Sequence, residues 1–191
     1  MGKILILRFI FLGLFVINIS FADDISIYES DSKIVIKQLG KKLKTTVKSI
    51  IKESGPVIAL EYCNIAALEL TKEVSFKNDL VIRRTSLRYR NENNIPDSWE
   101  FSVLKSFEKR LKNGEEFKFI NISAIVKEEG KNFFRYMQVI PVGKPCLTCH
   151  GTNIKPEISS KIRELYPKDK AIGFMVGEIR GAFSVKIPLV N

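Results

Sequence analysis

The sequence FKFINISAIVK (residues 117–127) is separated by EEGKN (128–132) from FFRYMQVIPV (133–142). Both long stretches are rich in β-branched and aromatic residues, and the five residues between them suit a hairpin loop. The pattern predicts two antiparallel strands, and residues 181–188 predict a closing strand. Helices before and between such strands indicate an α+β fold, with one sheet and helices packed on it.

Residues 25–53 have the spacing of an amphipathic helix. Ile36, Leu39 and Leu43 recur at steps of three and four residues, and lysines fill the other face. Ser54-Gly55-Pro56 ends this helix, because glycine and proline interrupt helical hydrogen bonding. The same reasoning predicts the remaining elements, which are helices over 57–74, 98–112 and 158–165, and a strand with one polar face over 81–90.

The first 22 residues have the features of a secretory signal peptide. Lys3 and Arg8 precede the apolar run 9–17, and Ser20-Phe21-Ala22 offers a small-x-small cleavage site before two aspartates. The uninterrupted apolar run is well below the roughly 20 residues that a bilayer requires, which disfavours a retained anchor. We therefore expect an exported, periplasmic mature chain with no stable membrane span after cleavage.

The chain is basic, with a formal net charge of +10. Its lysines are spread along the sequence rather than packed in one block, so most of them form a solvated surface. No zinc-finger pair, KH loop or RNP strand is present in the sequence, and export also argues against a nucleic-acid partner. The charge is compatible with docking to an acidic redox or signalling protein.

Pro145-Cys146-Leu147-Thr148-Cys149-His150 contains C-x-x-C-H, the attachment motif of c-type haem. Two thiols at this spacing can add to the two vinyl groups of one porphyrin, and the adjacent imidazole then reaches the iron. The motif predicts one covalently attached haem c, with Cys146 and Cys149 as attachment sites and His150 as an iron ligand.

Two alternatives remain open for these residues. Cys146 and Cys149 can form a redox or structural disulfide in an oxidising compartment, which would suit a thiol oxidoreductase. Together with Cys63 and His150 they can instead compose a zinc site of three sulfurs and one nitrogen. Haem is favoured over a thioredoxin-like site because the motif follows a late strand rather than opening a helix in a βαβ unit.

His150 is the only histidine, so a second iron ligand from this chain must be of another type. Cys63, Met137 and Met175 are the candidates. Methionine commonly fills gaps in cores, which is the alternative for both methionines. Cys63 is left as an unpaired thiol once haem has taken the other two cysteines, so it is either a ligand or a buried inert cysteine.

Several further motifs follow one another along the chain. They are Glu61-Tyr62-Cys63-Asn64, RRTSLRYRN at 83–91, PDSWE at 96–100, PCLTCHG at 145–151, LYP at 165–167 and GEIRGAFS at 177–184. With these motifs, the stretch from about Gly55 to Pro188 resembles the small PAS-like c-type haem family. The resemblance implies a PAS-like five-stranded antiparallel sheet with flanking helices, found alone or as the sensor part of membrane-bound signalling proteins. It also implies that the iron is bound by the motif histidine, here His150, and by a cysteine thiolate, here Cys63.

The expected organisation is therefore a signal peptide at 1–22, an N-terminal amphipathic helix at 23–54 and a PAS-like c-type haem domain at 55–191. We expect this domain to act as a redox or gas-responsive sensory module, with a periplasmic electron-transfer cytochrome as the alternative. Arg84 and Arg88 are candidate partners of the haem propionates, because a guanidinium matches carboxylate geometry. No acid/base pair, phosphate loop or nucleophile triad is apparent, so we do not expect an enzyme.

Overall fold

The computed structural model describes residues 21–189, with side chains from residue 25 onward. Helix α1 spans Phe21–Lys77 and is interrupted at Gly55, whose φ of 84° and ψ of 170° are not helical. Glycine reaches positive φ without strain, and Pro56 after it fits the first position of a new helix. The predicted end of the first helix at these residues is thus confirmed. Residues 1–20 of the predicted signal peptide lie outside the described residues.

A four-stranded antiparallel sheet forms the centre of the described chain, in the order β1-β4-β3-β2. Its strands are β1 (Val81–Thr85), β2 (Asn121–Glu128), β3 (Lys131–Pro141) and β4 (Ile179–Pro188). The described residues thus provide four strands, not the five that the resemblance implied. The strand predicted over 81–90 ends early because the Ser86 side chain bonds the backbone, accepting from the Arg88 amide and donating to the Arg180 carbonyl.

The hairpin of β2 and β3 is tighter than the sequence indicated. Its turn is Glu129-Gly130 rather than the five residues 128–132, and both residues have positive φ, 49° and 81°. Two positive φ values in a two-residue turn match the right-handed twist of the flanking strands. Residues 117–119, predicted as the start of a strand, form a single 3-10 turn instead.

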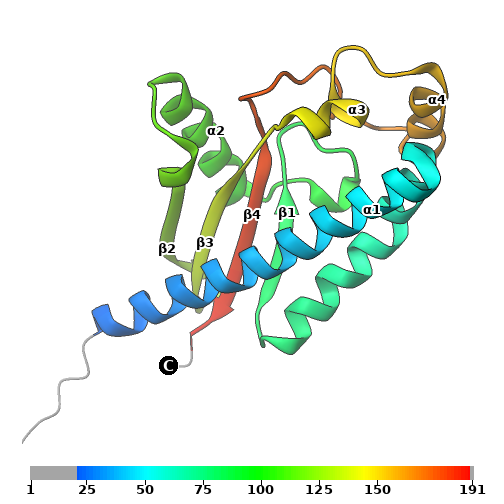
Figure 1. Ribbon diagram of the computed structural model, residues 1–191. Helices are drawn as coiled ribbons and strands as arrows, with labels where there is room; N and C mark the ends of the chain where they lie inside the picture. Colours follow the sequence, from blue (N-terminus) through cyan, green and yellow to red (C-terminus); the bar gives the residue numbers. More distant parts are fainter. Residues whose placement is uncertain (1–20, 190–191) are drawn as a thin grey trace, which may run out of the picture.

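Helices cover both faces of the sheet (Figure 1). They are α1, α2 (Ser98–Lys112), α3 (Leu147–His150) and α4 (Pro156–Leu165), with single 3-10 turns at Glu92–Asn94, Phe117–Phe119 and Lys144–Cys146. The predicted helix over 98–112 is confirmed. It begins with a capping box in which Asp97 accepts from the Glu100 amide and Glu100 accepts from the Asp97 amide.

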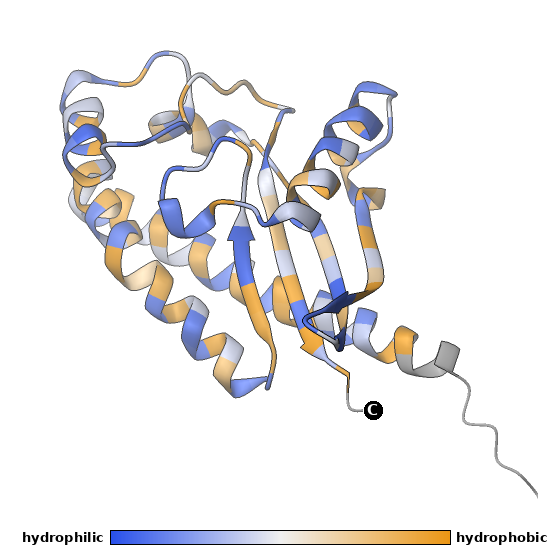
Figure 2. Ribbon diagram, turned by 180° about the vertical axis from the view of Figure 1, so that it is seen from behind, coloured by the Kyte–Doolittle hydropathy of each residue, from blue (hydrophilic) through white to orange (hydrophobic). Residues whose placement is uncertain are grey.

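The core lies in two layers because alternate residues of a strand face opposite sides. On one side, Phe134 and Tyr136 pack against Leu39 of the first half of α1. On the other, Met137 packs against Phe107 of α2. Figure 2 shows hydrophobic positions along the central strands, with paler polar positions between them.

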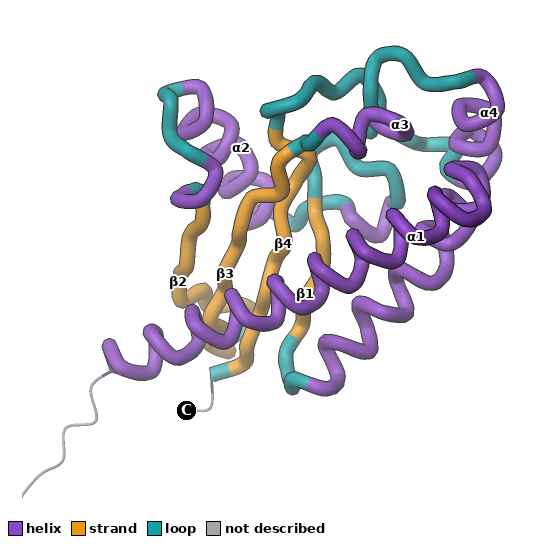
Figure 3. The backbone as a smooth tube through the Cα atoms, viewed as in Figure 1, coloured by secondary structure: helices purple, strands orange, loops and turns teal. Residues whose placement is uncertain are grey.

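The loops after β3 and after α4 gather at one end of the sheet, beside the kink of α1 (Figure 3). Hydrogen bonds join them, from the Phe174 amide to the His150 carbonyl and from the Gly173 amide to the Gly151 carbonyl, both 2.8 Å. Within the described part of the chain, no helix is both long enough and apolar enough to cross a membrane.

Candidate functional site

The C-x-x-C-H motif folds as two tight consecutive turns at this loop-rich end. Cys146 ends the 3-10 turn Lys144–Cys146, and α3 follows at once with Cys149 and His150. Gly151 ends α3 where a Cβ would lie 2.6 Å from the Leu147 carbonyl oxygen, closer than real Cβ contacts allow. The sequence therefore needs glycine directly after the histidine to close the motif.

His150 is held by its Nδ1, which lies 2.7 Å from the carbonyl oxygen of Ala171. A carbonyl can only accept, so Nδ1 carries the proton and Nε2 keeps its lone pair. The ring meets the Phe174 ring edge-on, with the centroids 6.3 Å apart. Burial lowers the pKa of His150 well below its ordinary value, and Arg180 and Arg90 add to the effect. The imidazole is therefore neutral and has the form that binds metals.

A buried ion pair, the Arg90–Asp169 clamp, fixes the backbone around the motif. Arg90 reaches both carboxylate oxygens of Asp169 at 3.2 Å, and each side chain is 8% exposed. Its Nη2 also donates to the carbonyls of Cys149, at 2.6 Å, and Ala171, at 3.1 Å. The clamp thus joins Cys149 to the same carbonyl that accepts from His150.

The second half of α1 carries Cys63 to the neighbourhood of the motif. Cys149 packs in one cluster with Leu60, one helical turn before Cys63. Burial raises the pKa of the Cys63 thiol, and the charges of Arg84 and Arg90 oppose this rise. Burial likewise raises the pKa of Cys149, and the nearby Cys63 adds to that effect. Two sulfurs distant in sequence are therefore close enough to influence each other's charge.

Arg84, a predicted site residue on β1, is half-buried beside Cys63. Burial lowers the pKa of Arg84, while Cys63 and Tyr166 oppose that change. Its guanidinium makes no hydrogen bond or ion pair with the residues that the structure describes. A half-buried cation without a counter-charge is suited to an anionic group from outside the chain.

Arg88, the other predicted arginine, also lies at the site. Its guanidinium stacks over the Phe174 ring at 3.8 Å from the centroid and donates to the Ile172 carbonyl. Arg180 of β4 lies beside it and donates to the Arg88 carbonyl at 3.0 Å. Burial and the charge of Arg90 lower the pKa of Arg180 to about 9. The end of the sheet thus collects arginines around the motif.

Comparison with protein-family models identifies the family of this chain. The model of the Tll0287-like family matches residues 25–188. The chain belongs to the Tll0287-like family. Among solved structures, it is similar to the crystal structure of the cyanobacterial haem protein Tll0287. The identity is 25%, the match covers 90% of this chain and 99% of that one, and the TM-score is 0.64. No curated protein matches the chain.

The two methionines considered as iron ligands occupy very different places in this Tll0287-like chain. Met137 is 0% exposed and belongs to the core beneath α2, so it is not available at the motif. Met175 follows Phe174 in the loop but is 60% exposed. Of the three candidates, Cys63 is the one that the fold brings into the arginine-lined interior of the site.

The disulfide and zinc alternatives find no support in the arrangement. Cys63, Cys146 and Cys149 are all unpaired. Over residues 21–189, no three side chains of histidine, cysteine, aspartate or glutamate are grouped as metal ligands. A zinc site built from the three cysteines and His150 is therefore not formed.

Sequence reasoning missed the Arg90–Asp169 clamp and Arg180. Arg90 and Arg180 appeared only as members of the motifs at 83–91 and 177–184, and Asp169, two residues after LYP, was given no role. The available signal was an arginine-rich motif together with an aspartate that lies two residues after the later motif LYP. Only the fold shows that this arginine and this aspartate meet.

Proposed function

We propose that this chain is an exported single-haem c-type protein that acts as a redox or gas-responsive sensory module. Cys146 and Cys149 attach the haem, His150 is one iron ligand and Cys63 is the other. The observation that carries the proposal is the state of His150, a neutral imidazole whose Nδ1 is fixed by the Ala171 carbonyl inside a C-x-x-C-H motif. The similarity to a haem protein supports it.

The residues present fit a haem in three independent respects. Cys146 and Cys149 are unpaired thiols at the spacing that covalent attachment requires. The donor set of imidazole and sulfur is one that binds haem iron. Arg84 is a half-buried cation without a partner, which suits a propionate carboxylate.

A bound haem supplies one-electron redox chemistry and an iron atom to which small gases bind. The chain's own residues position and tune that group. The Arg90–Asp169 clamp holds the Cys149 and Ala171 carbonyls, and through Ala171 it holds the orientation of His150. Burial opposes a Cys63 thiolate while arginine charges favour it, a balance that suits a ligand whose bond to iron depends on redox state.

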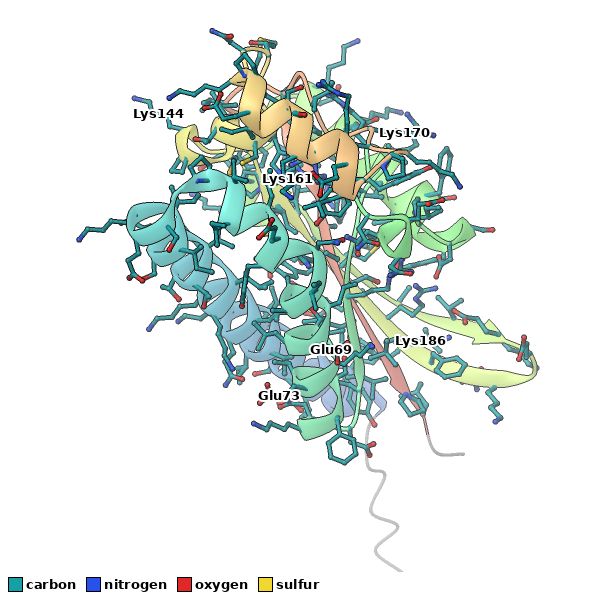
Figure 4. All side chains as sticks on the ribbon, turned by 90° about the vertical axis from the view of Figure 1, so that its right-hand side faces the viewer. Glu69, Glu73, Lys144, Lys161, Lys170 and Lys186 are labelled. Carbon is teal, nitrogen blue, oxygen red and sulfur yellow. The ribbon has the colours of Figure 1, made fainter. Side chains whose placement is uncertain are left out.

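Electron transfer is the second candidate, and it is favoured by lysines near the site. Figure 4 shows Lys144, Lys161 and Lys170 at the loop-rich end of the molecule. Lys161 is paired with Glu61 and Glu164, which leaves Lys144 and Lys170 without an ion pair among the described residues. Such a basic rim would attract an acidic electron-transfer partner.

A thiol oxidoreductase is disfavoured by the surroundings of Cys149. A reactive thiol of this kind has a lowered pKa, which makes the thiolate available at neutral pH. Burial instead raises the pKa of Cys149. We therefore propose a binding and sensing role rather than an enzymatic one.

The test is an absorption spectrum of the mature protein, oxidised and reduced, after expression with cytochrome maturation machinery. The wild type should show haem that stays with the chain in acidified organic solvent. Cys63→Ala should change the ferric spectrum, because it removes the sulfur ligand, whereas Met175→Leu should leave it unchanged. A colourless wild type would refute haem binding.

The same spectra separate the two roles. A sensor should lose the sulfur signature on reduction or on addition of carbon monoxide, because the sixth position then changes its ligand. An electron carrier should keep both ligands in both redox states. An identical ferric spectrum for Cys63→Ala and the wild type would exclude Cys63 as a ligand.

A further inference from the structure

A basic groove lies between the first half of α1 and the sheet, away from the C-x-x-C-H motif. Its volume is about 500 Å³. Its walls carry Lys33, Lys37 and Lys41 from α1, and Lys118, Gln138 and Tyr136 from the sheet side. In Figure 1 this half of α1 runs across the front of β3 and β4, before the kink that leads to Cys63. None of the haem-site residues lines this groove.

Two of the lysines in the basic groove have no counter-charge. Lys37 and Lys41 are four residues apart, one helical turn, and neither lies within ion-pair distance of a carboxylate among the described residues. Lys33 and Lys118, by contrast, each pair with a nearby glutamate, at 3.4 and 2.9 Å. The groove therefore presents two adjacent uncompensated ammonium groups on one wall.

The opposite wall offers neutral donors that also lack partners. Tyr136 is 1% exposed, and its hydroxyl makes no hydrogen bond within the described chain although it lines the groove. Burial, with a smaller contribution from the charge of Glu29, raises the pKa of Tyr136 to about 12, so the hydroxyl keeps its proton and can donate. The side-chain amide of Gln138 has no hydrogen-bond partner among the described residues either. Both groups line the groove without a hydrogen-bond partner among the described residues, so they are available to a ligand.

Two further side chains of the groove are apolar, and Asn121 adds another polar one. Ile36 and Phe183 line it, and the Phe183 ring comes within 3.3 Å of the position where a Cβ on Gly40 would stand. A pocket with apolar contacts and a few converging donors has the make-up of a small-molecule site, and its volume lies in the usual range of about 300–1,000 Å³.

We propose that the basic groove binds a small organic anion, a carboxylate or phosphate ester with an apolar body. The ammonium groups of Lys37 and Lys41 and the hydroxyl of Tyr136 bind the oxygens, because charge-assisted hydrogen bonds to oxyanions are the strong ones. Ile36 and Phe183 contact the body of the ligand. The site is separate from the haem site, so it gives the chain a second input.

The test is isothermal titration calorimetry on the mature, haem-loaded protein with phenylacetate and phenyl phosphate as probes, each an oxyanion with an apolar body. We expect saturable one-to-one binding of at least one probe. Binding of phenylacetate alone would assign a carboxylate ligand, and binding of phenyl phosphate alone would assign a phosphate ester. Absence of saturable binding for both probes overturns the proposal.

Matched variants locate the binding. Lys37→Gln with Lys41→Gln should weaken the bound probe at least about tenfold, the loss expected when charge-assisted hydrogen bonds are removed. Tyr136→Phe should weaken it less, because it removes one neutral donor. The control pair is Lys44→Gln with Lys48→Gln, exposed on the same helix but outside the groove, and it should leave affinity unchanged.

An equal loss in both lysine pairs would mean diffuse attraction to the lysine-rich face of α1, and it would overturn the groove site. The absorption spectrum of every variant should equal that of the wild type, because the substitutions lie away from the motif. A protein that binds a probe but lacks haem would refute the proposed function and leave the groove proposal standing.

Discussion

Substitution of Asp169 by asparagine should be strongly destabilising, because it leaves the Arg90 cation buried without its counter-charge. Both side chains of the Arg90–Asp169 clamp are 8% exposed, and two hydrogen bonds of 3.2 Å join them. Removing one partner of a buried ion pair costs about 3–5 kcal/mol. Asparagine keeps the volume and one acceptor for the Ala171 amide, so we expect the lower end of that range for Asp169→Asn.

The measurement is the free energy of unfolding of the haem-loaded protein from urea titration. The matched control is Glu108→Gln, which breaks an ion pair with Lys105 whose side chains are 56% and 50% exposed. An exposed pair contributes at most about 1 kcal/mol, so the control should lose little. A loss of less than about 1 kcal/mol for Asp169→Asn would refute the role given to the clamp.

Gly181→Ala should also destabilise the fold, because a Cβ there would lie 2.3 Å from the Thr85 carbonyl oxygen and the residue has a φ of +157°. Gly143→Ala, where the nearest atom to the Cβ lies 3.7 Å away and φ is −103°, is the control, and urea titration should show a much smaller loss. Burial raises the pKa of both Tyr136 and Tyr166 to about 12. Because tyrosine in the unfolded chain ionises near pH 10, the unfolded chain loses these protons first. The free energy of unfolding should therefore fall as the pH rises from about 10 to 12. An ultraviolet titration in which both phenols ionise with the exposed tyrosines would contradict this expectation.

Helix α2 shows what local sequence signals can establish. Asp97 and Glu100 have the spacing of a capping box, and the helix begins where they place it. The hairpin shows their limit, because Glu129 adopts a positive φ that side-chain type alone does not favour. The strand predicted over 81–90 ends at Thr85 for a similar reason, since Ser86 donates a hydrogen bond to the Arg180 carbonyl of a strand distant in sequence.

In the candidate site too, local sequence signals predict some residues, and others depend on contacts between distant parts of the chain. Cys146, Cys149 and His150 are visible in the sequence because the chemistry requires them to be adjacent. Cys63 became a candidate as the thiol left over once the motif has taken the other two cysteines, and the family resemblance then implied that it is a ligand, since no local pattern links it to the motif. The Arg90–Asp169 clamp joins residues 79 positions apart, and each looks like an ordinary surface charge until the fold brings them together.

The Ala171 carbonyl oxygen serves two donors at once, His150 Nδ1 and Arg90 Nη2. Both of its lone pairs are therefore engaged, and the arginine withdraws electron density from the oxygen. An acceptor weakened in this way leaves His150 as an ordinary imidazole, whereas a carboxylate in its place would push the ring toward imidazolate. In the proposed haem site, the histidine would thus fix geometry and donate little electron density, and the electron density at the iron would be set mainly by the Cys63 sulfur.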